Sequence, residues 1–385
     1  MNFDFDTIIN RRASESTKWR TFADDVLPMW VADMDFRAPE AVIAALQKKL
    51  DHGIFGYPSL PDGLTDTVLA WLSRRHGWEV EPEALVFLPG VVTGFNLAAQ
   101  ALTRPGEGVL VQTPTYGPFF RVAANANLIQ QEMELIRGDD GQYQVDLDAF
   151  EAAITSETRI FMLCNPQNPT GRVFRKDELE AMAEICLRNE VIICSDEIHS
   201  DLIYSGNKHI PIANLSPEIA NQTVTFIAPS KTFNIAGLKA SAAIIPNPEM
   251  REKFKAARRG VVDWVNLLGL TAMQAAYASG EPWLDALLLY LESNRDYLVD
   301  FVARELPSVR VTAPQGTFLA WLDYRELEIE QKPSTFFRQE AKVALNDGAW
   351  FGQGGEGFVR LNFGCPRATL EAGLGRLKTA VEKIC

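Results

Sequence analysis

The stretch A-P-S-K-T-F-N-I-A-G-L-K-A-S (228–241) places Lys231 directly after the run V-T-F-I-A (224–228). That run is apolar and rich in β-branched residues, which predicts a buried strand. Gly237 and the small residues after it indicate close backbone packing. An ammonium group is costly to bury unless a partner is supplied, because burial penalises its charged form. Lys231 is therefore either solvated at the end of the strand or placed there for its chemistry.

Short apolar runs alternate with helical patterns on both sides of this stretch. The runs are 85–88, 108–112, 159–164, 191–195, 224–228 and 242–246. Residues 177–189 instead place Leu179, Met182, Ala183, Cys186 and Leu187 at helical spacing, and Asp177 followed by Glu180 suggests a capping box. Strand, helix and strand in succession predict an α/β fold whose mostly parallel sheet is covered by helices on both faces.

The pattern changes near residue 283. A long helix is predicted there, with Leu284, Leu287, Leu288, Leu291, Leu298, Phe301 and Val302 on its buried face. Strands near 318–322 and 358–363 and a closing helix from about 368 follow. This part of the chain is expected to form a second, smaller α+β unit.

Composition narrows the classes of function. The chain has 385 residues, of which 47% are hydrophobic, and a formal net charge of -13. This size predicts two or three domains, and the negative charge argues against nucleic acid or an anionic membrane as the main partner. No signal-peptide pattern and no run of about 18 apolar residues is visible, so we expect a cytoplasmic protein.

The cysteines and histidines are those expected of a cytoplasmic protein without a metal site. The five cysteines are widely spread without a C-x-x-C pair, and they are expected to be reduced thiols, with Cys186 and Cys194 filling the core. The four histidines show no ligand spacing, so no metal site is expected.

Candidate site residues follow the predicted strands, where ligands bind in sheets of this kind. After 85–88 comes a glycine-containing turn with Thr93 that could hold a phosphate at a helix N-terminus. Tyr116 follows 108–112, N-P-Q-N-P-T-G (165–171) follows 159–164, and D-E-I-H (196–199) follows 191–195. Taken singly, each has a structural alternative as a turn, a helix cap or a core residue. The motif G-Q-G-G-E-G (352–357) is interpreted as a loop, because a strand follows it where a dinucleotide-binding turn needs a helix.

The motifs are far more specific in combination. N-P-x-N-P-T-G, S-D-E-I-H and S-K-T-F-N-I-A-G-L, in this order and spacing, resemble the fold type I pyridoxal-phosphate enzymes of the class I/II aminotransferase family. M-W-V-A-D-M-D-F (29–36) and D-E-I-H-S-D-L-I-Y (196–204) are similar to the carbon–sulfur lyase branch, the cystathionine β-lyases of the MalY/PatB type. The resemblance implies an N-terminal segment (1–35) packing with the small domain, a large cofactor-binding domain (36–282) and a small C-terminal domain (283–385).

The resemblance also implies roles for single residues. Lys231 would form a Schiff base with pyridoxal phosphate, and Asp196 would pair with the pyridine nitrogen of the cofactor. The other cofactor-binding residues implied are Asn168 at the phenolic oxygen, Tyr116 stacked on the ring, and Val92, Thr93 and Ser230 at the phosphate. Two departures stand out, since His199 replaces the usual tyrosine near the phenolic oxygen and Lys239 replaces a phosphate-binding arginine.

Further implied roles concern the substrate and the assembly. Arg360 would bind the α-carboxylate of an amino acid substrate, completed by the backbone at Ala32. Tyr57 would reach the cofactor of a neighbouring subunit, which implies a homodimer with shared active sites.

Three functions remain open at this point. The first is a carbon–sulfur lyase acting on cystathionine or a similar cysteine conjugate. The second is an aminotransferase, which would need a keto acid for turnover. The third is a regulatory binding protein on the same fold, which intact Lys231, Asp196 and Arg360 disfavour as a sole role.

Overall fold

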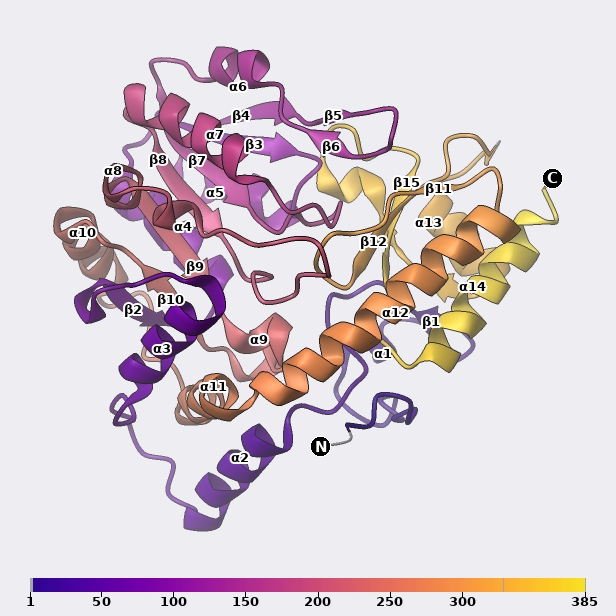
Figure 1. The fold of residues 1–385 in the computed structure, drawn as a ribbon, viewed down its shortest axis with the longest axis horizontal. Coiled ribbons are helices and arrows are strands. Elements are labelled where there is room, and N and C mark those ends of the chain that lie inside the picture. The colour runs from indigo at the N-terminus through magenta and orange to yellow at the C-terminus, as the bar shows by residue number, and fades with distance from the viewer. Residues whose placement is uncertain (1–2, 328, 385) are drawn as a thin grey trace.

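Within residues 3–327 and 329–384, which the computed structural model describes, seven strands form the large sheet (Figure 1). Strands β9, β8, β7, β3 and β4 are parallel neighbours, and β10 runs antiparallel to β2 and β9. In sheet order the strands are β2 (Leu85–Leu88), β10 (Ser241–Ile244), β9 (Thr223–Ile227), β8 (Ile192–Asp196), β7 (Thr158–Cys164), β3 (Gly108–Thr113) and β4 (Ile129–Glu134). The predicted α/β fold with a mostly parallel sheet is confirmed.

Both faces of this sheet are buried, which is why its strands appear as continuous apolar runs. Along β7, Ile160 and Met162 pack on one face while Phe161 and Leu163 pack on the other. The first face is covered by α4 (Val91–Leu102), α5 (Phe120–Ala126) and α10 (Pro248–Arg258), and the second by α6 (Leu147–Ala153), α7 (Lys176–Arg188) and α8 (Pro217–Asn221).

Helix α7 is the amphipathic helix expected at 177–189, with one correction at its start. Leu179, Met182, Ala183 and Cys186 are buried as predicted. The helix is capped at Arg175, however, whose backbone N–H donates to Glu178 at 2.9 Å. The predicted capping box of Asp177 and Glu180 is wrong, because the helix begins at Lys176 and Glu178 reaches back to the cap instead.

Strand β4, at one edge of the large sheet, has no counterpart among the predicted strands. Its sequence I-Q-Q-E-M-E has one buried side chain, Met133, and Ile129, Gln130, Glu132 and Glu134 are exposed. An edge strand with so little apolar surface lacks the signal by which buried strands are recognised.

The C-terminal part of the chain carries a smaller antiparallel sheet. Its order is β11 (Arg310–Val311), β12 (Leu319–Asp323), β15 (Phe358–Asn362) and β14 (Asn346–Asp347). The long helix α12 (Glu281–Glu305) and the closing helix α14 (Arg367–Val381) pack on each other beside it (Figure 1). In the N-terminal segment, β1 (Leu27–Pro28) pairs in parallel with β13 (Val343–Ala344). The domain boundaries at 36 and 283 stay predictions.

Loop residues 352–357 lead into β15, so G-Q-G-G-E-G opens no helix. Cys186 and Cys194 are fully buried, and Cys385 lies outside the described residues. None of the helices in the described part of the chain is both long and apolar enough to cross a membrane. The other elements are α1 (Thr17–Arg20), α2 (Glu40–His52), α3 (Leu64–His76), α9 (Pro229–Thr232), α11 (Leu267–Ser279), α13 (Pro333–Phe336), β5 (Ile136–Arg137) and β6 (Tyr143–Gln144).

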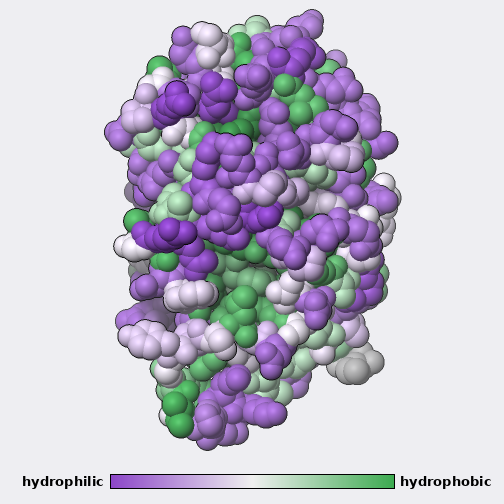
Figure 2. Space-filling model, turned by 90° about the vertical axis from the view of Figure 1, so that its left-hand side faces the viewer, coloured by the Kyte–Doolittle hydropathy of each residue, from purple (hydrophilic) through white to green (hydrophobic). Residues whose placement is uncertain are grey.

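Hydrophobic side chains lie exposed near β2, α10 and the loop after α10. They surround a groove of about 490 Å³ that includes Leu60, Phe87 and Trp264. Figure 2 looks onto the side of the molecule that carries α10, β2 and α3, and it shows green side chains gathered in a hollow there. Trp264 is 67% exposed and Phe55 59% exposed. Exposed apolar surface gathered in this way marks an interaction site on a protein surface.

A buried ion network ties the N-terminal segment together. The carboxylate of Asp35 accepts hydrogen bonds from Lys18 Nζ at 2.7 Å, Arg11 Nη1 at 2.6 Å and Trp19 Nε1 at 2.7 Å. Lys18 and Asp35 are both almost completely buried. Burial alone would raise the pKa of Asp35, but Lys18, Trp19 and Arg11 outweigh it and hold the pKa below its usual value of 3.8. The ionised carboxylate therefore stabilises the fold above that pH, and this stabilisation is lost as the pH falls through the folded-state pKa.

We expect Asp35→Asn to lower the free energy of unfolding by about 3–5 kcal/mol, because the substitution removes the nearest counter-charge of the buried Lys18 ammonium and leaves it only Asp33, at 3.8 Å. Urea unfolding at pH 7, followed by circular dichroism, measures the loss. The matched control is Asp24→Asn, since Asp24 pairs with Arg12 while 95% exposed and should change stability by less than about 0.5 kcal/mol. Equal midpoints for the two variants would contradict a stabilising role for this network.

Candidate active site

A pocket of about 780 Å³ lies at the carboxyl ends of β2, β3, β7, β8 and β9. This is the edge at which ligands bind in sheets of this type. The structure brings together here almost every residue that the sequence proposed for the site. Those lining the pocket are Ala32, Val92, Thr93, Tyr116, Asn168, Asp196, His199, Ser230, Lys231, Lys239 and Arg360.

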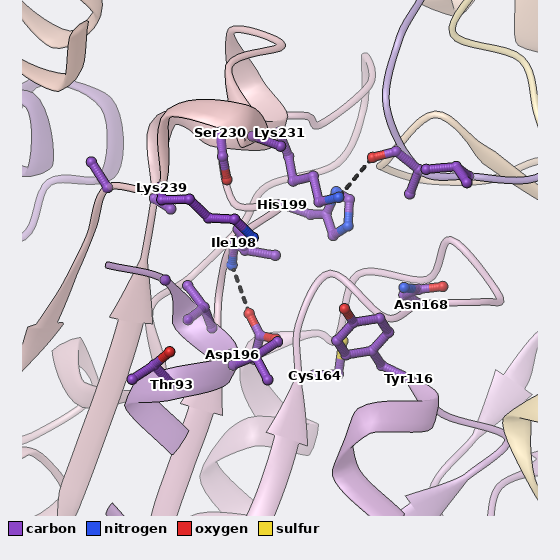
Figure 3. Close-up of a pocket in the computed structure, with 18 of the residues that line it drawn as sticks. Thr93, Tyr116, Cys164, Asn168, Asp196, Ile198, His199, Ser230, Lys231 and Lys239 are labelled. Atoms are coloured by element: carbon purple, nitrogen blue, oxygen red, sulfur yellow. Dashed lines mark hydrogen bonds between the residues drawn. The ribbon is translucent and has the colours of Figure 1, made fainter. Parts of the chain in front are cut away.

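Lys231 projects into the pocket from α9, the single helical turn that follows β9 (Figure 3). Its amine donates a hydrogen bond to the carbonyl of Ala32 at 2.6 Å. Burial is the main cause that lowers the pKa of Lys231 to about 8, and the positive charge of Arg360 adds to it. Lys231 is therefore closer to its neutral, nucleophilic form at pH 7 than an ordinary lysine, which has a pKa of about 10.4.

Asp196 ends β8 and is buried at the floor of the pocket. Its carboxylate accepts a hydrogen bond from the N–H of Ile198 at 3.1 Å. Burial raises the pKa of Asp196 to about 7, although the Ile198 N–H and the charge of Lys231 oppose the rise. A cationic group placed against this carboxylate would restore its ionised form, so the site favours a protonated partner.

His199 and Tyr116 face the same space (Figure 3). His199 is buried, and its Nδ1 has no hydrogen-bond partner among the described residues. Burial, followed by the charges of Lys231 and Arg360, holds the pKa of His199 well below its usual value, so the imidazole is neutral at pH 7. Burial raises the pKa of Tyr116 to about 12, which keeps its phenol protonated.

Arg360 enters the pocket from β15 of the small sheet. It donates to Asn168 Oδ1 at 2.8 Å, to the Trp30 carbonyl at 2.9 Å and to Asn346 Oδ1 at 2.6 Å. Burial lowers the pKa of Arg360 to about 10, so it remains charged at pH 7. Its Nε is buried without a partner in the described part of the chain. A guanidinium held in place with donors to spare can bind a carboxylate.

The N-terminal segment 30–36 lies between the two sheets and bonds to both through its backbone. From the large-sheet side, Lys231 donates to the Ala32 carbonyl, and Asn234 bonds to the backbone of Met34 and Phe36 at 2.8–2.9 Å. From the small-sheet side, Asn362 donates to the carbonyls of Val31 and Asp33, both at 2.6 Å. The backbone of this segment thus sets the position of Lys231 and Arg360 relative to one another.

The opposite wall is the N-terminus of α4. Gly90 precedes the helix, and none of the described side chains caps it. The N–H groups of its first turn therefore have no partner within the helix and suit an anion such as phosphate. Thr93, Ser230 and Lys239 line the pocket with this turn, and they add two hydroxyls and a positive charge. Lys239 has a left-handed backbone (φ 54°), a strained conformation of the kind found at functional sites.

Tyr57 does not reach this pocket. It lies in the segment after α2 and is fully exposed. Tyr57 therefore does not line the pocket of its own chain. Its predicted role in the site of a partner subunit stays a prediction.

Among the pocket residues that were not proposed from the sequence are two from the C-terminal part of the chain. Asn346 holds Arg360, and Trp350 packs edge-on against Tyr116 with ring centroids 6.1 Å apart. Both come from the segment between α13 and β15, just before the loop 352–357. Neither residue follows a strand of the large sheet, where candidate site residues were sought. The one sequence feature that could have indicated them is the indole of Trp350 beside the glycine-rich loop.

Together these groups fit an anionic ligand with a cationic ring and a second, carboxylate-bearing ligand. The N–H groups in the first turn of α4 can bind a phosphate. Asp196 can bind a cationic ring nitrogen, and Arg360 can bind a carboxylate. His199 Nδ1 and Arg360 Nε have no partner among the described residues, which indicates polar partners that a ligand would supply.

Comparison with known proteins agrees with this chemistry. The family Aminotransferase class I and II matches residues 24–377. The chain is 44% identical to cystathionine beta-lyase PatB of Bacillus subtilis, over 98% of this chain and 100% of that protein. It is 36% identical to protein MalY of Escherichia coli, over 99% of this chain and 100% of that protein. Cystalysin from Treponema denticola, whose crystal structure contains pyridoxal 5'-phosphate, has a TM-score of 0.96 at 34% identity and covers 100% of both chains. The chain belongs to the class I and II aminotransferase family.

Proposed function

We propose that this chain is a pyridoxal-phosphate-dependent carbon–sulfur β-lyase, which cleaves L-cystathionine or a related cysteine S-conjugate to a thiol, pyruvate and ammonia. The observation that carries the proposal is the pocket that joins Lys231, Asp196 and Arg360 in a chain similar over its whole length to a cystathionine β-lyase. The amine, the carboxylate and the guanidinium are the groups that this reaction needs.

The pocket's residues fit pyridoxal phosphate. The N-terminus of α4 with Val92 and Thr93, together with Ser230 and Lys239, would bind the phosphate. Asp196 would bind the ring nitrogen, Tyr116 would stack on the ring, and Asn168 and His199 would lie at its phenolic oxygen. When bound, the cofactor supplies an electron sink for the electron pair left on the substrate's Cα.

The chain's own residues then bind the substrate and move the proton. Arg360, with the backbone at Ala32, would hold the α-carboxylate and so orient the Cα–H bond. Lys231, with its pKa lowered to about 8, would accept the Cα proton on Nζ. Loss of that proton lets the Cβ–S bond break with its electron pair leaving on sulfur, and water completes the release of pyruvate and ammonia. A thiolate leaves readily because sulfur carries negative charge well.

An aminotransferase is the alternative, because both reactions begin with the same proton transfer. His199 favours the lyase: a neutral, buried imidazole stands where the resemblance leads us to expect the tyrosine of aminotransferases. A solely regulatory role is disfavoured, because a protein that only binds a partner has no need of a lysine with a lowered pKa.

We further infer a homodimer with shared active sites. Tyr57 is fully exposed beside exposed Ile54 and Phe55, and the groove around Trp264 offers apolar surface for a second copy of the chain. In such a dimer Tyr57 would reach the cofactor of the partner subunit.

The reaction class is tested with L-cystathionine in the absence of any keto acid. We expect sustained release of pyruvate, ammonia and homocysteine, followed by lactate dehydrogenase coupling and a thiol reagent. Lys231→Ala should abolish this turnover. Sustained turnover only after a keto acid is added, across cystathionine, cystine and S-alkyl cysteines, would favour the aminotransferase instead.

The acid–base state of Lys231 is tested by labelling amines in the cofactor-free protein at a series of pH values. Because the amine reacts only when neutral, labelling of the Lys231 peptide should rise through about pH 8, well below the value of about 10.4 for an ordinary lysine. Mass spectrometry quantifies the label. Arg360→Gln should move the inflection upward, because it removes a positive charge that lowers the pKa of Lys231. An inflection near pH 10 in the wild-type protein would contradict the lowered pKa of Lys231.

The shared site is tested by mixing Lys231→Ala subunits, which should be inactive alone, with Tyr57→Phe subunits, which should be weakly active alone. In a mixed dimer one of the two sites receives an intact lysine from one chain and an intact tyrosine from the other, so random exchange should restore about a quarter of wild-type activity. Light scattering after size exclusion checks the dimer mass. A monomer, or exchange without recovered activity, would show that Tyr57 does not act across subunits.

A further inference from the structure

A second hollow of about 340 Å³ adjoins the active-site pocket. The two share Asn346 and Trp350 in their walls. The hollow is formed by α13, the single π-helical turn after it (Phe337–Ala341), β14 and the N-terminal segment. Its remaining lining residues are Phe22, Lys332, Ser334, Thr335, Arg338, Ala344, Leu345 and Asp347.

The shared wall touches the proposed carboxylate site directly. Asn346 Oδ1 accepts a hydrogen bond from Arg360 Nη2 at 2.6 Å. The indole of Trp350 packs against Tyr116 and is 45% exposed. A substrate held by Arg360 therefore has this hollow as its neighbour, with an indole beside the connecting space. An aromatic face of this kind contacts a thioether favourably.

The hollow is positively charged in a chain whose net charge is -13. Its one acidic side chain, Asp347, is already satisfied: it accepts from the Ala349 N–H and from Ser334 Oγ, both at 2.9 Å, and Lys332 Nζ lies 3.8 Å away. Arg338 is different. It is half-buried, and among the described residues no carboxylate lies within ion-pair distance of it. In the part of the chain that the structure describes, the hollow thus presents one guanidinium without a carboxylate partner.

The guanidinium of Arg338 is also held in place. Its central carbon lies 5.5 Å from the centroid of the Phe22 ring. Stacking on an aromatic ring fixes the plane of a guanidinium and leaves its edge free to donate two parallel hydrogen bonds. The edge of such a group matches a carboxylate.

We propose that this hollow is a subsite for the far end of the substrate, in which Arg338 binds a carboxylate carried by the S-substituent of a cysteine conjugate. The proposal rests on the proposed function and names its substrate class: conjugates whose S-substituent ends in a carboxylate, L-cystathionine among them. Arg360 and Arg338 would then bind the two carboxylates of one substrate, with Trp350 beside the thioether between them.

The test compares two substrates that differ in one charge, S-(2-carboxyethyl)-L-cysteine and its neutral amide, S-(2-carbamoylethyl)-L-cysteine. The wild-type enzyme should prefer the acid in kcat/KM. Arg338→Met keeps the bulk of the side chain and removes the charge, so it should lower the acid-to-amide ratio about ten- to a hundredfold. Arg338→Lys should restore part of the ratio. Arg304→Met, which removes an exposed arginine on α12, is the matched control and should leave the ratio unchanged.

Binding without turnover separates this proposal from the proposed function. In 2-aminoheptanedioate a methylene replaces the sulfur of S-(2-carboxyethyl)-L-cysteine, so no thiolate can leave, and its binding is measured by calorimetry. Weaker binding of this compound to Arg338→Met by at least about tenfold supports the subsite even if no thiol is ever released from a conjugate. An acid-to-amide ratio and an affinity that Arg338→Met leaves unchanged would overturn the subsite, even in an active lyase.

Discussion

The rest of the site depends on the backbone of residues 30–36, which lies between the large and the small sheet. Carbonyls of this segment accept hydrogen bonds from Lys231 and Arg360, and Asn234 and Asn362 bond to it from opposite sides. Two buried cations close to one another repel, and the carbonyl oxygens offset part of that repulsion by accepting their N–H groups. Burial, and after it the charge of Arg360, lowers the pKa of Lys231 to about 8, while Arg360 stays charged at pH 7. A base for proton transfer and a binding group for a carboxylate require these two states.

The same arrangement explains why three far-separated parts of the chain are needed for one site. The large sheet supplies the amine and the carboxylate, the small sheet supplies the guanidinium, and the N-terminal segment joins them. The ion network of Asp35 with Lys18 and Arg11 anchors this segment from within. Loss of the network should disturb the pocket, because Asp33 and Asp35 directly follow Trp30, Val31 and Ala32, which line it.

Much of the fold and of the site could be read from the sequence. The strands that flank Lys231 and Asp196 are buried on both faces, so each appears as an apolar run with a polar residue at its end. Other features have no comparable pattern in the sequence. Strand β4 is exposed and polar, the cap of α7 depends on where the helix begins, and Asn346 and Trp350 reach the pocket only through the packing of the small sheet. Tyr57 could be placed only by resemblance, because its predicted partner is another chain.

Strand β4 has a consequence for the behaviour of the protein in concentrated solution. Within the described residues, one side of this strand has no neighbour in the sheet. Unpaired N–H and C=O groups on such an edge can recruit strands from other molecules. Its sequence I-Q-Q-E-M-E places two glutamates along that edge. Like charges would meet if two copies aligned there, and the repulsion opposes ribbon-like aggregation. The polar residues that distinguish β4 from the buried apolar strands are thus expected to oppose pairing of this edge with another molecule.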